Sequence, residues 1–422
     1  MVQTLIDLGW NKDAAFFVAS LLGVIVCASF GLVWILFSIW LERKVAGRIQ
    51  DRVGPNRTGP YGLFQSFADL GKLITKEDIT PANADRHVYN IAPLLAVASV
   101  IMIFAVVPFS ASWIGADLNI GVLYFIAVAS LGTLAIMLAG WGSNNKYSLL
   151  GAFRVIAALI SYEVPTILAL VVPVMLAGTM SMQGIVHGQT IAYIFVAPVS
   201  AFIFFVSQLA EAGRSPFDLM EAESEIIAGY NIEYTGMKFG MFMASEFIHG
   251  FVICVLTVIL FMGGWQFLGT GQPGSEVFGF MVMMGKSVLV YFLVMLIRAT
   301  MPRFRIDHMM AFNWKFLVPL ALANIIIIAL LGKLFVPDYA AARAAVEAGG
   351  LAGILGGVLG AGFLAELPRA VVCLIGNIAL WIVASNALKN YATTEQTHIR
   401  SLIAERKLDR KPSTAVEPAA GD

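Results

Sequence analysis

Acidic side chains crowd into one short stretch, residues 211–234, of a chain that is 59% hydrophobic and only 13% charged. The stretch carries six carboxylates and a single base: Glu211, Asp218, Glu221, Glu223, Glu225, Glu233 and Arg214. If it is helical, Asp218, Glu221 and Glu225 lie on one face about 6 Å apart, and like charges at that spacing raise one another's pKa. Such a group shares protons near neutral pH. We therefore predict that it holds and passes protons; the alternative is a solvated acidic surface, which the surrounding apolar residues disfavour.

Glu163 is a single acid inside an apolar run, RVIAALISYEVP. It follows a basic residue, Arg154, and a helical rise of about 1.5 Å per residue places it about 13 Å deep in a membrane. An acid at that depth costs on the order of 3 kcal/mol, and it lowers this cost by protonating, pairing or facing water. We predict a proton-carrying site; the alternative is a neutral glutamic acid that is hydrogen-bonded only for packing.

Lys286 is a base deep inside another apolar run, about 18 Å from the basic end of that run by helix rise. We expect an internal carboxylate partner or an amine that loses its proton easily, with an outward-reaching side chain as the alternative. Glu246 and His249 stand three residues apart on one helix face, and so do Glu211 and Arg214. Such pairs are often simply structural.

These groups need a membrane to position them. The mean hydropathy of +0.82 over 422 residues is higher than a soluble core of this size can bury. Nine apolar runs of about 20 residues or more can each cross roughly 30 Å of hydrocarbon as a helix. They cover residues 14–40, 91–114, 118–141, 155–178, 191–210, 247–268, 277–297, 316–337 and 370–388. We therefore predict an all-α, polytopic integral membrane helical bundle with about nine transmembrane helices.

The connections on one side of these runs carry the positive charge. Residues 41–90 hold eight Lys and Arg residues, whereas the short connections near residues 115, 184 and 270 hold none. By the positive-inside rule the first set is cytoplasmic, which places the N-terminus outside and the C-terminus in the cytoplasm. The long, charged tail favours a bacterial inner membrane.

A polar connection after the first run contains GPYGLFQSFADLGKLITKED. Its apolar side chains recur at helical spacing: Leu63, Phe64, Phe67, Leu70, Leu73 and Ile74. This pattern predicts a cytoplasmic-side amphipathic helix over about residues 60–77, lying in the membrane interface. It either anchors the protein at the surface or forms the aromatic rim of an opening for a hydrophobic molecule from the lipid.

The pattern changes after residue 337. A Gly-rich run over residues 349–367 precedes Pro368, and a crossing there would leave the basic tail outside, so we predict a re-entrant or tightly packed segment. The chain then divides into a membrane domain, a Gly-rich segment with an additional transmembrane helix, and a polar cytoplasmic tail. The ranges are residues 1–337, with the acidic loop at 211–235, then 338–391 and 392–422.

The three cysteines, Cys27, Cys254 and Cys373, form no CxxC pair, and the five histidines add no ligand pattern. The chain also has no GxxxxGK[ST] loop, no GxSxG elbow and no HExxH pair. We predict that it binds no metal or flavin and that any redox centre lies in a partner. No feature points to nucleic acid.

Four segments resemble a known family. They are LERKVAGRIQDRVGPNRTGPYGLFQSFADLGKLITKEDITP, GWGSNNKYSLLGAFR followed by SYE, LAEAGRSPFDLMEAESEIIAGYNIEYTGMKFGMF, and RATMPRFRIDHMMAFNWKFLVPL. In order, over roughly residues 14–337, they resemble the respiratory complex I membrane subunit that carries the quinone channel, in its mitochondrial and bacterial forms. Two departures are Ala158, where the family commonly has Gln, and the region after about residue 338, which exceeds the shorter members.

The resemblance implies site residues, which we combine with those singled out above. For a quinone chamber they are Glu42, Arg43, Arg52, Phe64, Phe67, Asp69, Phe217 and Asp218. For proton coupling they are Tyr162, Glu163, Glu211, Arg214, Glu221, Glu223, Glu225, Tyr234, Glu246 and Lys286. No residue is expected to be catalytic, and Arg303 with Arg305 resembles a basic motif of the family.

The expected function is that of a non-redox subunit of a proton-translocating NADH:quinone oxidoreductase, with ubiquinone or menaquinone as substrate and no catalysis by the isolated chain. Expected partners are peripheral iron–sulfur and quinone-site subunits on the cytoplasmic side, small and antiporter-like membrane subunits, and the lipid bilayer. Two alternatives are an anchor subunit of a related membrane-bound hydrogenase and a proton-coupled secondary transporter. The chain shows no inverted repeat of the kind that many transporters carry.

Overall fold

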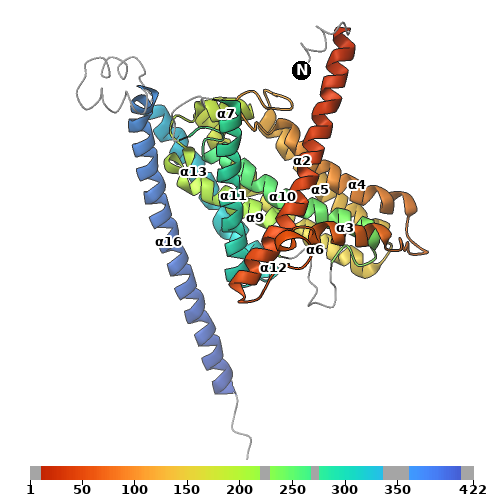
Figure 1. Cartoon of the computed structure of the whole chain (residues 1–422). Coiled ribbons are helices and arrows are strands. Elements are labelled where there is room, and N and C mark those ends of the chain that lie inside the picture. Colours follow the sequence, from red (N-terminus) through yellow and green to blue (C-terminus); the bar gives the residue numbers. More distant parts are fainter. Residues whose placement is uncertain (1–10, 219–228, 268–274, 336–360, 410–422) are drawn as a thin grey trace, which may run out of the picture.

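The computed structural model describes residues 11–218, 229–267, 275–335 and 361–409, and within these ranges its regular structure is entirely helical (Figure 1). The helices are α2 (Lys12–Ile49), α3 (Gln65–Thr75), α4 (Arg86–Ile103), α5 (Gly121–Gly142), α6 (Lys146–Ala177), α7 (Met182–Gly188), α8 (Tyr193–Val196), α9 (Pro198–Glu211), α10 (Gly236–Phe261), α11 (Glu276–Thr300), α12 (Ile306–Phe312), α13 (Val318–Leu334) and α16 (Ala361–Asp409). Short 3₁₀ turns lie at Pro60–Gly62 and Phe104–Val106, and a π-helical turn at Asn313–Leu317 joins α12 to α13.

Eight of the described helices are long and apolar enough to cross a membrane, and α9 is a shorter apolar helix. The prediction of a polytopic helical membrane protein is confirmed. The run at 191–210, however, is not one helix: a four-residue α8 ends at Val196 and α9 begins at Pro198. Proline lacks a backbone N–H and disfavours helical geometry in the residue before it, so the helix breaks at Ala197. The remaining α9 spans only about 21 Å.

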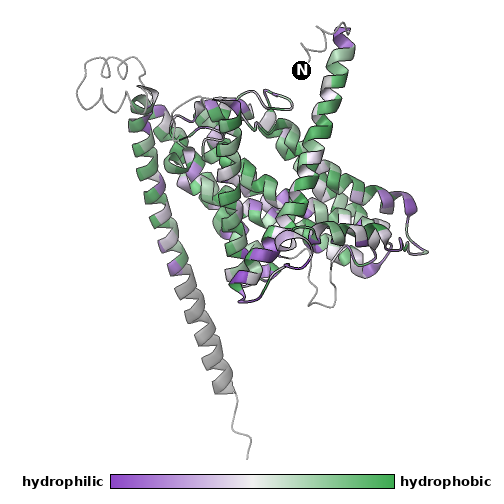
Figure 2. Ribbon diagram, viewed as in Figure 1, coloured by the Kyte–Doolittle hydropathy of each residue, from purple (hydrophilic) through white to green (hydrophobic). Residues whose placement is uncertain are grey.

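Helix α10 forms the centre of the bundle. Nearly every side chain from Ile248 to Phe261 is inaccessible, because α4, α9, α11 and α2 pack around it. By contrast, α2 and α16 lie on opposite flanks in Figure 1, and Figure 2 shows mainly apolar side chains along α2 and along the described part of α16. Both flanks therefore suit contact with lipid or with other membrane helices.

The predicted amphipathic helix exists but is shorter than residues 60–77. A turn at Pro60–Gly62 comes first, and α3 then covers residues 65–75 beside the end of α10. Leu73 approaches Gly240 so closely that a Cβ at that glycine would lie 2.9 Å from its Cδ1. Phe64, Phe67 and Ile74 are exposed, as expected for side chains that enter the membrane interface.

The additional helix α16 packs against α13 and against the break between α8 and α9. Residues 361–367, predicted to belong to the re-entrant segment, lie in α16 itself, whereas residues 349–360 fall outside the described ranges. One side chain ties α16 to the break. Asn377 is buried; its Oδ1 accepts from the Val199 N–H at 3.3 Å, and its Nδ2 donates to the Cys373 and Val196 carbonyls at 2.9 and 3.5 Å.

Replacing Asn377 with Ala should therefore destabilise the protein, because it leaves backbone groups of the broken helix buried without partners. The expected cost is about 1 to 3 kcal/mol, measured as a lower midpoint of thermal unfolding in lipid nanodiscs. Asn386→Ala, at an exposed position of the same helix, is the control and should change stability by less than about 0.5 kcal/mol. Equal effects of the two variants would contradict this role.

Candidate functional site

A cluster of charges joins three parts of the fold at one end of the bundle. Glu42 of α2 accepts hydrogen bonds from the Tyr291 hydroxyl at 2.5 Å and from Arg298 Nη1 at 2.6 Å, both on α11. Arg214, in the connection after α9, adds an Nη1 contact at 3.3 Å. The Glu42 side chain is only 12% exposed, and these partners offset the cost of removing its charge from water.

Arg214 extends this cluster into the protein. Its Nε lies 3.7 Å from Oε1 of Glu246 on α10, and its guanidinium stands 4.5 Å from the ring centre of Phe247. Its side chain is 4% exposed. Burial by itself would lower the pKa of Arg214, but the carboxylates of Glu42 and Glu246 outweigh burial and raise that pKa above its ordinary value. Arg214 is thus a permanent cation between two acids.

A cavity of about 580 Å³ opens beside the cluster. Its polar lining includes Glu42, Arg43, Arg52, Asp69, Lys72 and Arg298, and its apolar lining includes Leu73, Phe239, Met243, Phe247 and Met295. Arg43 Nη1 donates to Asp69 Oδ2 at 2.5 Å across it, from α2 to α3. A cavity with apolar walls and a few convergent polar groups suits a small molecule with a polar head and an apolar body. We call it the chamber.

Four of the eight residues predicted for a chamber line this cavity, namely Glu42, Arg43, Arg52 and Asp69. Phe64 and Phe67 lie on and just before α3 and do not line it. Phe217 is buried between Tyr162 and Phe304, with ring centres 5.5 and 5.8 Å apart. Asp218 lies close enough to Arg214 to contribute to its electrostatic field.

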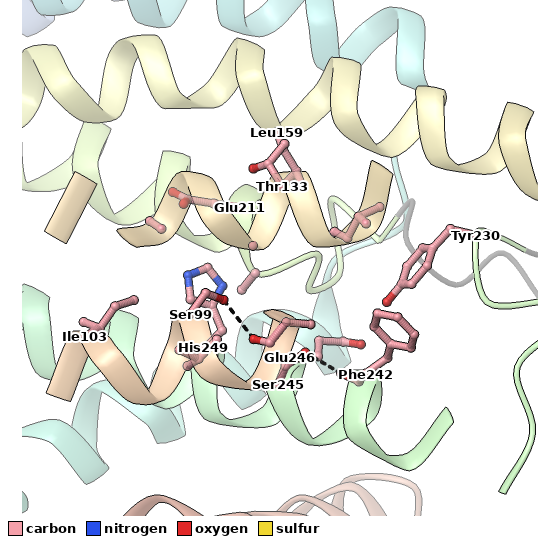
Figure 3. A pocket seen from close by; sticks show the side chains of 16 residues that line it. Ser99, Ile103, Thr133, Leu159, Glu211, Tyr230, Phe242, Ser245, Glu246 and His249 are labelled. Carbon is pink, nitrogen blue, oxygen red and sulfur yellow. Dashed lines mark hydrogen bonds between the residues drawn. The ribbon is translucent and has the colours of Figure 1, made fainter. Parts of the chain in front are cut away.

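A second cavity of about 60 Å³ lies within the bundle and is shown in Figure 3. Glu211, Glu246 and His249 line it, together with the hydroxyl-bearing side chains of Ser99, Thr133, Tyr230 and Ser245. One water needs roughly 10 to 15 Å³ of such space, so several fit. A hydrogen-bonded chain of waters would therefore connect Glu246 with Glu211.

Glu211 also borders a smaller cavity, of about 10 Å³, that it shares with Glu163. Glu211 accepts a hydrogen bond from Gln208, and the Thr133 hydroxyl donates to Glu163 at 3.4 Å. The polar groups thus form a series that starts at the chamber: Glu42, Arg214, Glu246, the second cavity, Glu211, and Glu163 within α6. We call this the acid series.

The two tyrosines predicted for coupling lie beside this series and bond to backbone. The Tyr162 hydroxyl donates to the Met309 carbonyl at 3.1 Å. Tyr234 stacks on Tyr89 with ring centres 4.1 Å apart and donates to its carbonyl at 3.2 Å. Burial raises the pKa of Tyr234, so its hydroxyl stays protonated. Tyr230 lines the second cavity, and Tyr234 does not.

Lys286 lies away from the acid series. Its Nζ donates to the carbonyls of Met262, Gly264 and Gln266 at 2.8, 3.1 and 2.6 Å, just beyond the end of α10. In the described part of the chain these carbonyls take the place of the carboxylate that we expected. All three ammonium hydrogens have acceptors, and the side chain reaches outward, as the alternative proposed. The carbonyls also carry the negative end of the helix dipole.

Sequence reasoning missed five residues of the site: Gln208, Tyr291, Arg298, Thr133 and His249. Tyr291 and Arg298 are seven residues apart, hence on one face of α11, and this spacing was a usable signal. Gln208, Thr133 and His249 stand in apolar helices, where a polar side chain needs a partner. Glu221, Glu223 and Glu225 lie outside the described residues.

Comparisons with known proteins agree with this geometry. The family model described as NADH dehydrogenase matches residues 22–329. A Dehalococcoides mccartyi protein, named as the NADH-quinone oxidoreductase subunit that the four segments resemble, is 47% identical over 314 residues, which is 74% of this chain and 87% of that protein. Proteins of the same name from Brevibacillus brevis and Bacillus thuringiensis are 43% and 42% identical, over 78% and 79% of this chain and 97% and 100% of theirs.

Arg214→Leu should be strongly destabilising, because it leaves Glu246 buried beside an apolar side chain. Removing one partner of a buried ion pair costs roughly 3 kcal/mol or more, measured as a lower thermal midpoint in nanodiscs. Arg43→Leu is the matched control, since Arg43 is 49% exposed and exposed pairs contribute about 1 kcal/mol or less. The double variant Arg214→Leu with Glu246→Leu should recover part of the loss; no recovery would contradict the pairing.

Proposed function

We propose that this chain, which belongs to the NADH dehydrogenase family, is the membrane subunit of an NADH-quinone oxidoreductase that receives quinone in the chamber and moves protons through the acid series. As such it is an integral membrane protein and one part of an oxidoreductase complex with further subunits. The observation that carries the proposal is the continuity of the acid series, from Glu42 at the chamber to Glu163 inside the bundle.

The chamber suits a quinone for two reasons. Its apolar wall on α10 and α11 complements an isoprenoid tail, while Arg298, Arg43 and Arg52 present donors to the two carbonyl oxygens of a quinone head group. The exposed rings of Phe64 and Phe67 lie at the neighbouring α3, where an apolar molecule from the lipid would pass. Electrons come from a redox centre in a partner, because this chain supplies the binding groups and not the redox chemistry.

Quinone reduction takes two electrons and two protons and yields quinol. The electrons arrive first, so negative charge develops in the chamber before the protons neutralise it. A charge 4 Å from another is worth about 4 kcal/mol at an effective dielectric constant of about 20. This is enough to draw Arg298 from Glu42 toward the reduced head group. Glu42 then loses a donor and becomes a better proton acceptor.

Arg214 transmits this change inward. When Glu42 is protonated, the Arg214 cation pairs more strongly with Glu246, because the competing carboxylate has become neutral. A proton on Glu246 then leaves for the second cavity and passes by water to Glu211 and on to Glu163. Quinol release restores the Arg298–Glu42 pair and resets the series.

The acidic loop at 211–235, with Glu221, Glu223 and Glu225, adds further proton sites beneath the chamber in this proposal. The chamber faces the cytoplasm of a bacterial inner membrane, with the N-terminus outside and the C-terminus in the cytoplasm. Peripheral iron–sulfur and quinone-site subunits cover the chamber, and small and antiporter-like membrane subunits continue the route beyond Glu163. The substrate is ubiquinone or menaquinone. No observation favours the hydrogenase anchor or the transporter.

Glu211→Gln and Glu163→Gln should each lower proton translocation by roughly tenfold or more, because an amide cannot carry the proton across its step of the series. The measurement is proton uptake by vesicles that contain the assembled complex, driven by NADH and quinone. Electron transfer from NADH to a soluble artificial acceptor should be unchanged. Asp13→Asn, at an exposed position of α2, is the control; full proton translocation in both glutamine variants would refute the acid series.

Met243→Trp tests the chamber by filling it. A tryptophan there should raise the KM for quinone about tenfold, since a bulky ring takes up apolar wall that the substrate needs. Met237→Trp is the matched control, on the same helix at a position that is 44% exposed and outside the chamber lining. An unchanged KM in Met243→Trp would show that quinone binds elsewhere.

A further inference from the structure

A third cavity, of about 320 Å³, lies at the other end of the bundle from the chamber, between α6, α13 and α16. Its apolar wall includes Met175 and Leu176 at the end of α6 and Ile328 on α13. Two cationic side chains also line it, Lys333 from the last turn of α13 and Arg369 from α16. The acid series does not reach this cavity, and neither cation contributes to the chamber.

The charge balance of the cavity is positive. Arg369 Nη2 lies 2.6 Å from Oε2 of Glu366, one turn away on α16. Its side chain is 14% exposed, and its Nε is buried without a hydrogen-bond partner among the described residues. Lys333 is half-buried, and within the described part of the chain it makes no hydrogen bond or ion pair. One acid therefore faces two bases, and donors remain unused.

The depth of the cavity explains which ligand would use those donors. Helix α6 ends at Ala177 and α13 ends at Leu334, so the cavity lies where both helices leave the apolar layer. Lipid phosphates occupy this level of a bilayer, and their acyl chains run inward from it. A guanidinium and an ammonium above an apolar wall match these two parts of a phospholipid.

We propose that this cavity binds an anionic glycerophospholipid, with its phosphate between Arg369 and Lys333 and an acyl chain against Met175, Leu176 and Ile328. The lipid would join α16 to α6 and α13. Arg369 and Lys333 both lie beyond residues 22–329, the part that matches the family model. The site therefore belongs to the C-terminal extension and is independent of quinone chemistry.

The test is lipid retention by the whole complex. The complex is purified in detergent, delipidated, incubated with phosphatidylglycerol, phosphatidylcholine or inorganic phosphate, and analysed by native mass spectrometry of the released chain. We expect the wild-type chain to retain phosphatidylglycerol in preference to phosphatidylcholine. Lys333→Gln should weaken this retention about fivefold, which corresponds to about 1 kcal/mol for one basic residue at the membrane surface.

Two further variants separate charge from geometry. Arg369→Lys keeps the ion pair with Glu366 but loses the planar fork, and it should also weaken retention. Lys12→Gln removes an exposed base at the start of α2, outside the cavity, and should leave retention unchanged. Equal retention of the two lipids by the wild-type chain, equal losses in Lys333→Gln and Lys12→Gln, or binding of inorganic phosphate without phosphatidylglycerol would each overturn the proposal.

Discussion

The burial of Arg214 is the constraint on which the rest of the site depends. A guanidinium cannot be neutralised at any ordinary pH, so it stays buried only if carboxylates are held against it. Glu42 and Glu246 meet this need from α2 and α10. The charge of Glu42 requires further donors, which come from Tyr291 and Arg298 on α11. One buried cation thus fixes how three helices meet.

The same constraint links the chamber to the interior. Because Arg214 contacts both acids, a change in the charge of Glu42 alters the field at Glu246 without any movement of the backbone. Beyond Glu246 the contacts are no longer direct, and cavities of about 60 and 10 Å³ separate the remaining acids. Protons cross such gaps through water, whereas ions and quinones are too large to follow. The route is therefore open to protons and closed to larger solutes.

Backbone hydrogen bonding governs the opposite side of the bundle. A membrane offers no water to the free ends of a broken helix, so the break at Pro198 requires an internal partner. Asn377 supplies it from α16, and Lys286 does the same for the carbonyls beyond the end of α10. Both side chains are polar groups in apolar helices, and in both cases the partner is backbone. This explains why Lys286 needs no carboxylate.

The sequence by itself determined the class of protein and most of its spans, because hydrophobicity and helix length are local properties that the bilayer reads directly. It also identified the acids of the series, since a carboxylate in an apolar run is costly wherever it stands. Only the tertiary structure decided the partners. Glu42 and Arg298 are 256 residues apart, and no periodicity connects them. Helix packing sets which faces meet, where α9 begins and which cavities remain, because these depend on the fit of distant side chains.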